Sequence, residues 1–163
     1  MHLNNQIIRK FRSMNQFTIK GNLVDCLSRR LTPASIEVRE GSIHSIEMLD
    51  RISPDPALPF ICPGFVDAHV HIESSMLIPA AFARLAVVHG TVSTVSDPHE
   101  IANVCGMEGV RFMIDNGKTV PFKFNFGAPS CVPATVFETA GDVLNASHVK
   151  ALLESEDVKY LTE

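Results

Sequence analysis

Strand and helix signals alternate from about residue 60 to the end of this 163-residue chain, and this alternation constrains the fold most. Residues 79–90 begin with proline and end with glycine, as helices often do, and the β-branched stretch TVSTVS follows as a strand. Further strands are expected near Phe60, Val120 and Val158, with a helix between each pair, the last beginning at a Ser147 cap. Repeated β-then-α units imply a parallel sheet.

The N-terminal part has a different pattern. Residues 17–47 alternate apolar and polar side chains in short runs, with a hairpin turn expected at Glu40 and Gly41, which predicts a small antiparallel β-element. Pro54, Pro56 and Pro59 then predict a linker, because proline extends neither a helix nor a sheet.

Composition excludes several classes of partner. A formal net charge of -4 argues against binding to a nucleic-acid backbone, and Arg84 and His89 break the apolar stretches before membrane-spanning length. The four cysteines form no C-x-x-C pair and no secretory signal precedes them, which favours reduced thiols in the cytoplasm.

The stretch VDAHVHIESS carries the first group of candidate functional side chains. Alternate residues of a strand share a face, so Asp67, His69 and His71 are expected to converge at the end of the strand that begins near Phe60. A polar cluster without a ligand is the alternative, but His-x-His after an apolar strand favours a metal site.

A second group, Asp97, His99 and Glu100 in SDPHE, follows the next strand. Read alone, DPHE is as consistent with a structural turn as with a functional loop. In a closed parallel barrel, however, the carboxyl ends of all strands ring one mouth, where catalytic groups collect. Co-location with the histidines therefore favours the functional interpretation.

Three motifs, PGFVDAHVHIESSM, VSDPHEIANVCG and PSCVPAT, together resemble the amidohydrolase superfamily. Within it, HIESSM, DPHEIANV and SCVPAT resemble the adenine deaminases of bacteria and archaea, from about Phe17 to the last residue. The resemblance implies an α/β fold: the first half of a (β/α)₈ TIM-like barrel, preceded by part of a small β-sandwich. The expected segments are an N-terminal extension (1–16), a partial β-sandwich with linker (17–58) and barrel strands 1–4 (59–163).

By the same resemblance, His69 and His71 are metal ligands of the first barrel strand, and Glu163 is the carboxylate ligand of the fourth. Further ligands and the proton-transferring aspartate are expected beyond the C-terminus. Residues expected to support the ligands or to contact substrate are Asp67, Glu73, Asp97, His99 and Glu100. The implied cofactor is a divalent metal, with Mn²⁺ or Fe²⁺ favoured over Zn²⁺ and two ions in the full-length enzyme.

The implied activity is hydrolysis of adenine to hypoxanthine and ammonia, a purine-salvage reaction, by a homo-oligomer at full length. Replacing the exocyclic amine needs a nucleophile stronger than neutral water, and a divalent metal lowers the pKa of bound water toward about 7. At Glu73, an anionic side chain suits a substrate that offers N–H donors, while bracing of the loop is an equal alternative.

The signatures of two other classes of metal-dependent hydrolase are incomplete or absent. His71 and Glu73 spell the H-x-E of zinc-dependent cytidine deaminases, but the P-C-x-x-C that completes that signature is absent, and so is the H-E-x-x-H of metalloproteases. A second hypothesis remains, a shortened and non-catalytic relative that binds metal or acts as an interaction domain. Under either hypothesis we expect the chain alone to lack turnover and to associate through open sheet edges.

Overall fold

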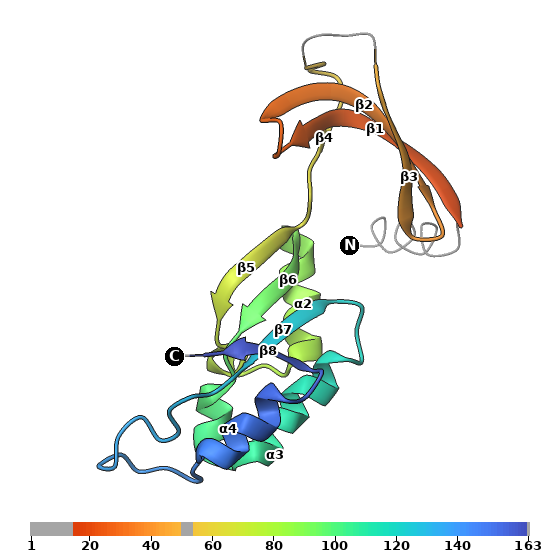
Figure 1. Cartoon of the computed structure of the whole chain (residues 1–163). Coiled ribbons are helices and arrows are strands. Elements are labelled where there is room, and N and C mark those ends of the chain that lie inside the picture. Colours follow the sequence, from red (N-terminus) through yellow and green to blue (C-terminus); the bar gives the residue numbers. More distant parts are fainter. Residues whose placement is uncertain (1–14, 50–53, 163) are drawn as a thin grey trace. The chain divides into compact units, whose positions relative to one another are not determined.

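The structure is a computed structural model that describes residues 15–49 and 54–162 (Figure 1). The chain divides after Pro63 into two compact units. Of the expected N-terminal extension, residues 1–14 lie outside the described part, and Gln16 is already the first residue of a strand.

The first unit is a four-stranded sheet with the order β3-β2-β1-β4. Its strands are β1 (Gln16–Asp25), β2 (Arg30–Arg39), β3 (Ser42–Met48) and β4 (Phe60–Ile61). The first three are antiparallel neighbours, as the alternating pattern predicted. The predicted turn at Glu40 and Gly41 is confirmed, because both residues have positive φ, 50° and 77°, which a two-residue type I′ hairpin requires.

The predicted proline-rich linker is tied to β1 by one buried side chain. Asn22, 1% exposed, donates from Nδ2 to the carbonyl oxygens of Asp55 (2.8 Å) and Leu58 (3.0 Å) and accepts from the Asp55 N–H (2.8 Å). The segment that leads into β4 is therefore held against β1 by hydrogen bonds that satisfy a buried amide.

The strand expected to start near Phe60 starts instead at Phe65. Phe60 and Ile61 belong to the other sheet, where they pair in parallel with β1. Pro63 has no N–H with which to continue a ladder, so pairing stops there. At Gly64 a Cβ atom would lie 2.4 Å from the Val92 side chain, so the chain passes close to its neighbour before the strand begins.

The second unit is a four-stranded parallel sheet with the order β5-β6-β7-β8. Its strands are β5 (Phe65–Val70), β6 (Thr91–Ser96), β7 (Lys123–Ala128) and β8 (Val158–Leu161). The connections carry η1 (Ile72–Ser75), α2 (Pro79–Ala86), η2 (Val87–His89), α3 (His99–Gly117) and α4 (Ala146–Leu153). Each strand pairs with the next one along the chain, and the helices of the connections lie on one face of the sheet (Figure 1).

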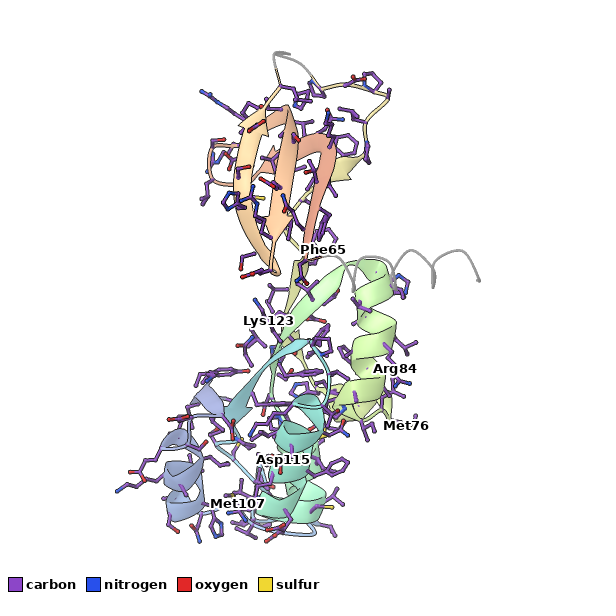
Figure 2. All side chains as sticks on the ribbon, turned by 90° about the vertical axis from the view of Figure 1, so that its right-hand side faces the viewer. Phe65, Met76, Arg84, Met107, Asp115 and Lys123 are labelled. Atoms are coloured by element: carbon purple, nitrogen blue, oxygen red, sulfur yellow. The ribbon has the colours of Figure 1, made fainter. Side chains whose placement is uncertain are left out.

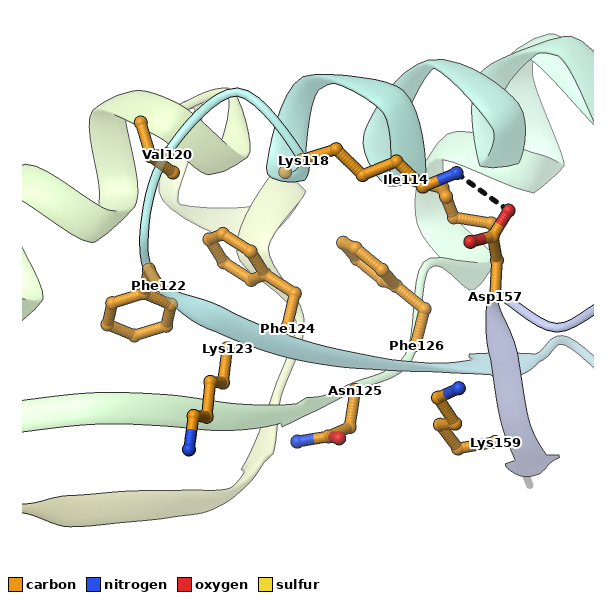
Figure 3. Close-up of a pocket in the computed structure, with 11 residues that line it drawn as sticks. Ile114, Lys118, Val120, Phe122, Lys123, Phe124, Asn125, Phe126, Asp157 and Lys159 are labelled. Atoms are coloured by element: carbon orange, nitrogen blue, oxygen red, sulfur yellow. Dashed lines mark hydrogen bonds and ion pairs between the residues drawn. The ribbon is translucent and has the colours of Figure 1, made fainter. Parts of the chain in front are cut away.

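The two faces of β7 differ sharply. Phe124 and Phe126 project toward α3, whereas Lys123 and Asn125 project from the other side of the strand (Figure 3). The helix side forms the core, where Phe126 packs with Val110, Met113 and Ile114 of α3, Leu152 of α4 and Val158 of β8. The opposite face carries buried or half-buried polar groups, since Asn125 Nδ2 donates to Ser93 Oγ (3.1 Å).

Two element boundaries differ from the sequence expectation. β7 begins at Lys123 and not near Val120, because the amides of Thr119 and Val120 bond back to the last turn of α3. The Ser147 cap is also wrong, since α4 begins at Ala146 with Asn145 as N-cap. Asn145 Oδ1 accepts from the N–H groups of Ser147 (3.0 Å) and His148 (3.1 Å), as a capping residue does.

The turn after η1 exposes an apolar side chain. Met76, 93% exposed, has a φ of 58° and ends η1 just before α2 (Figure 2). Its N–H donates to the Glu73 carbonyl (2.8 Å), which closes the short helix. Within the described residues, the helices are too short or too polar to cross a membrane.

Candidate metal centre

The two histidines of the H-x-H motif meet at the carboxyl end of β5. His69 lies in the strand and His71 follows its last residue, Val70. Their Nε2 atoms are 3.1 Å apart and their ring centroids 5.0 Å apart. The expectation that these two side chains converge is confirmed.

The other ring nitrogen of His71 determines which atom is available for a ligand. His71 Nδ1 lies 3.0 Å from the carbonyl oxygen of Asp97, which can only accept a hydrogen bond. His71 therefore carries its proton on Nδ1 and presents the Nε2 lone pair to His69. A histidine that donates one N–H to a carbonyl and binds with the other nitrogen is the usual arrangement of metal-ligating imidazoles.

The spacing of the two Nε2 atoms fits a shared ion. Two imidazole nitrogens about 2.1 Å from one ion, at octahedral or tetrahedral angles, are roughly 3.0–3.4 Å apart. The observed 3.1 Å lies in that range. The donor set of the pair therefore fits a divalent metal.

Asp97 and His99 form a second pair beside the first. Asp97 is 4% exposed, and its Oδ2 lies 2.9 Å from His99 Nδ1. Burial alone would lower the pKa of His99, but the hydrogen bond and charge of Asp97 outweigh it, so the pKa is raised. The rings of His71 and His99 meet edge to face with centroids 4.7 Å apart. The 97–100 stretch thus joins the two histidines of the H-x-H motif, as their expected co-location implied.

His99 and Glu100 lie in the first turn of α3, where the sequence suggested a loop or turn. The short helix η1 is tied to this turn, because Ser74 Oγ donates to Glu100 Oε1 (2.8 Å) and Glu73 Oε1 accepts from the Ile101 N–H (3.2 Å). The Ile101 amide is one of the N–H groups that a helix start leaves without an intrahelical partner.

The two carboxylates of this turn have opposite pKa shifts. Burial, with Glu100 close by, raises the pKa of Glu73. Burial also disfavours ionised Glu100, but the Ser74 hydrogen bond and the nearby histidines lower its pKa overall. Of the two carboxylates, Glu100 is therefore the one whose ionised form is favoured beside the histidines.

His71, His99 and Glu100 form a possible metal site, with ligand atoms within 4.8 Å of one another. His71 Nδ1 is 3.1 Å from Glu100 Oε2. If Nδ1 bound the ion, it would give up the hydrogen bond to the Asp97 carbonyl. The His71 tautomer set by that bond favours the His69 side of the ring instead.

The remaining sequence candidates are placed as follows. Asp67 is half-buried, and its Oδ1 accepts from the His69 N–H (3.3 Å), so it braces the strand end. Glu163 lies outside the described residues. The sequence motifs do not include Tyr160, which lines a cavity of about 270 Å³ with His69 and Asp97 and donates to the Ser96 carbonyl (2.9 Å). Its position one residue before the end of the last strand, β8, was the available signal.

Comparison with known proteins identifies the family of the chain. A model of the amidohydrolase family matches residues 60–161, and the chain belongs to that family. The chain is 56% identical to the adenine deaminase of Sulfurovum sp. over 145 residues and 56% identical to that of Salinibacter ruber over 147 residues. It is 53% identical to the adenine deaminase of Borreliella afzelii over 152 residues.

These alignments cover most of the chain but little of the relatives. They include 89%, 90% and 92% of the chain and 26%, 26% and 27% of the respective relatives. The chain thus spans about a quarter of the length of the curated relatives it matches. The family implies a divalent metal, and the histidines described above are fitted to bind one.

Proposed function

We propose that this chain supplies the H-x-H part of the metal centre of an adenine deaminase, which converts adenine and water to hypoxanthine and ammonia. The observation that carries the proposal is the His69–His71 pair, whose Nε2 atoms are 3.1 Å apart while His71 Nδ1 is held by the Asp97 carbonyl. The relatives named adenine deaminase support the substrate.

We propose that the second unit is the first half of a (β/α)₈ barrel and that the first unit is part of a β-sandwich. The sequential parallel order β5-β6-β7-β8 supports the half-barrel, because a barrel grows by adding each strand beside the previous one. In that arrangement Glu163, after β8, is proposed as the carboxylate ligand. The segments 1–16, 17–58 and 59–163 remain the proposed divisions, with the division after Pro63 close to the last of them.

Each described residue has a definable task in this centre. His69 and His71 bind the ion, and the Asp97 carbonyl fixes the tautomer of His71. When bound, a divalent ion supplies a nucleophile at neutral pH by lowering the pKa of water. We propose two such ions, Mn²⁺ or Fe²⁺, because imidazole and carboxylate ligands suit both.

The loop carboxylates organise the mouth of the site. Glu73 and Ser74 hold η1 against the first turn of α3, so the two histidine-bearing segments keep a fixed distance. This contact favours the bracing interpretation of Glu73 over direct recognition of substrate N–H groups. We further propose that the full-length enzyme is a homo-oligomer in the cytoplasm. The four cysteines of the chain are free, and the cytoplasm keeps thiols reduced.

The test is an assay on the protein at its natural full length. With adenine and Mn²⁺ we expect hypoxanthine and ammonia in equal amounts, lost on His71→Asn and retained in His89→Asn, which changes an exposed histidine of η2. Metal bound by the His69–His71 pair without any turnover would overturn the enzymatic proposal and favour the binding-domain alternative.

A further inference from the structure

A second cavity is lined by His99 but by neither His69 nor His71. It has a volume of about 280 Å³, and its lining includes His99, Glu100 and Asn103 of α3 together with Cys131 and Glu138. The segment that follows Glu138 packs closely against α3: the Gly141 N–H donates to the Asn103 carbonyl (2.8 Å), and a Cβ at Gly141 would lie 2.3 Å from the Val104 carbonyl oxygen.

Two residues that line this cavity, Glu100 and Asn103, each carry a buried acceptor atom without a hydrogen-bond donor. Among the described residues, the buried side-chain polar atoms without a partner are Asp97 Oδ1, Glu100 Oε2 and Asn103 Oδ1. Glu100 Oε2 is 3.1 Å from His71 Nδ1, but the proton of that nitrogen points to the Asp97 carbonyl. Buried acceptors without a donor are rare in native proteins and call for a water, an ion or a ligand group.

The amide of Asn103 has a defined orientation. Its Nδ2 lies 3.4 Å from Glu138 Oε1, and turning the amide over would place two oxygens against each other. Oδ1 is therefore the atom left without a partner. His99 is fixed in the same way, because its Nδ1 donates to Asp97 and leaves Nε2 as an acceptor.

The cavity thus offers acceptors to whatever enters it. Its lining residues carry an imidazole nitrogen, a carboxylate oxygen and an amide oxygen, with a second carboxylate at Glu138, and no Lys or Arg is among its described lining residues. Imidazole, carboxylate and carbonyl groups in combination are the donors that Mn²⁺ and similar divalent ions take.

We propose that His99, Glu100 and Asn103 bind a divalent cation at a position separate from the His69–His71 pair. The two positions are divided by His71, whose Nε2 faces His69 while its Nδ1 is occupied by a hydrogen bond. This inference does not depend on the deaminase activity, since it concerns cation binding alone.

Mn²⁺ binding to the protein at its natural full length tests the proposal, with free Mn²⁺ measured by electron paramagnetic resonance. His99→Asn and Asn103→Leu should each weaken one class of Mn²⁺ by roughly tenfold or more. The class that His69→Asn removes should stay unchanged in both variants. His89→Asn, at an exposed histidine of the same unit, is the matched control and should leave every class unchanged.

Two results would overturn the proposal: Asn103→Leu and His99→Asn binding Mn²⁺ as the control does, or His69→Asn abolishing all Mn²⁺ binding. If the variants fail to fold, the wild-type protein still decides. An anomalous difference map at the Mn edge, from crystals soaked in MnCl₂, should show a peak between His99 and Asn103, and its absence would overturn the proposal.

Discussion

His69 and His71 present their Nε2 atoms to each other across 3.1 Å, although His71 lies beyond the last residue of β5. The contact depends on β6 and its following residues, because the Asp97 carbonyl holds the far side of the His71 ring. The Asp97 N–H in turn donates to the Val70 carbonyl (3.2 Å), so the ends of two parallel strands position one imidazole. A short motif on one strand becomes a ligand pair only when its neighbour is in place.

The first prediction concerns the tautomer of His71. In the metal-free protein, the hydrogen bond to the Asp97 carbonyl should keep the proton on Nδ1, leaving Nε2 unprotonated. Long-range ¹H–¹⁵N correlation spectra at neutral pH distinguish the two nitrogens by chemical shift. Exposed His89 provides the reference for an imidazole that exchanges between tautomers. A His71 spectrum with Nε2 protonated would contradict the assigned ligand atom.

The second prediction concerns Asp97 and His99. The Asp97 hydrogen bond and charge raise the pKa of His99 against the opposing effect of burial. In Asp97→Asn the charge is gone, so the pKa of His99 should fall below its wild-type value, as followed by NMR titration in EDTA. Asp115→Asn removes an exposed carboxylate of the same helix and should leave His99 unchanged.

The sign of the coupling to stability follows from the same shift. Because the folded pKa of His99 lies above the 6.5 of a free imidazole, the protonated form stabilises the fold. This contribution is present below pH 6.5 and is lost as the pH rises through the folded pKa. A pKa for His99 that is equal in Asp97→Asn and wild type would show that the pair contributes nothing.

Sequence patterns located the strand ends well because parallel strands alternate with helices at regular intervals. The stretch TVSTVS forms a strand as predicted, and the H-x-H motif lies at the end of a strand as predicted. Both predictions rest on period-2 and apolar signals, which are local properties of the sequence. The start of the first barrel strand was misplaced because Phe60 and Ile61 are as apolar as the strand that follows. Only the pairing with β1 tells them apart, and pairing is a long-range property.

The sequence predicted which residues form the candidate site, but it did not predict what each residue does there. His69, His71, Asp97, His99 and Glu100 were all singled out by residue type, and the structure brings them together. The carbonyl of Asp97, by contrast, has no signature in a sequence, because every residue carries one. Asn103 was likewise invisible, since its unpartnered oxygen depends on Glu138, 35 residues away.

The third prediction concerns the kink in α3. Gly106 has φ 56° and ψ -145°, a combination almost confined to glycine, and a Cβ there would lie 1.8 Å from Asp142 Oδ2. Gly106→Ala should lower the free energy of unfolding by about 3 kcal/mol or more, from backbone strain plus the clash. Urea denaturation monitored by circular dichroism measures the loss.

Gly90→Ala measures the cost of backbone strain at a glycine without the steric clash expected at Gly106. Gly90 also has positive φ, 89°, but its Cβ would meet only the Phe65 ring edge at 3.3 Å. The expected loss is therefore about 1–2 kcal/mol. Adding Asp142→Gly to Gly106→Ala should recover part of the stability; equal losses for both glycines, without recovery, would contradict the packing of Asp142 on the kink.

The last prediction uses the single tyrosine of the chain, which also lacks tryptophan, so that absorbance near 295 nm reports Tyr160 alone. Burial, and then the charge of Asp97, raises the pKa of Tyr160 to about 12, and its hydroxyl donates to the Ser96 carbonyl. In the folded protein, kept in EDTA, the tyrosinate signal should rise near pH 12, whereas in urea it should rise near the ordinary value of about 10. Since the folded pKa exceeds the unfolded one, folding stability should decrease as the pH rises from the unfolded toward the folded value. A folded-state midpoint equal to that in urea would mean that the Tyr160 hydroxyl is not held against β6 and would contradict the described arrangement of β8.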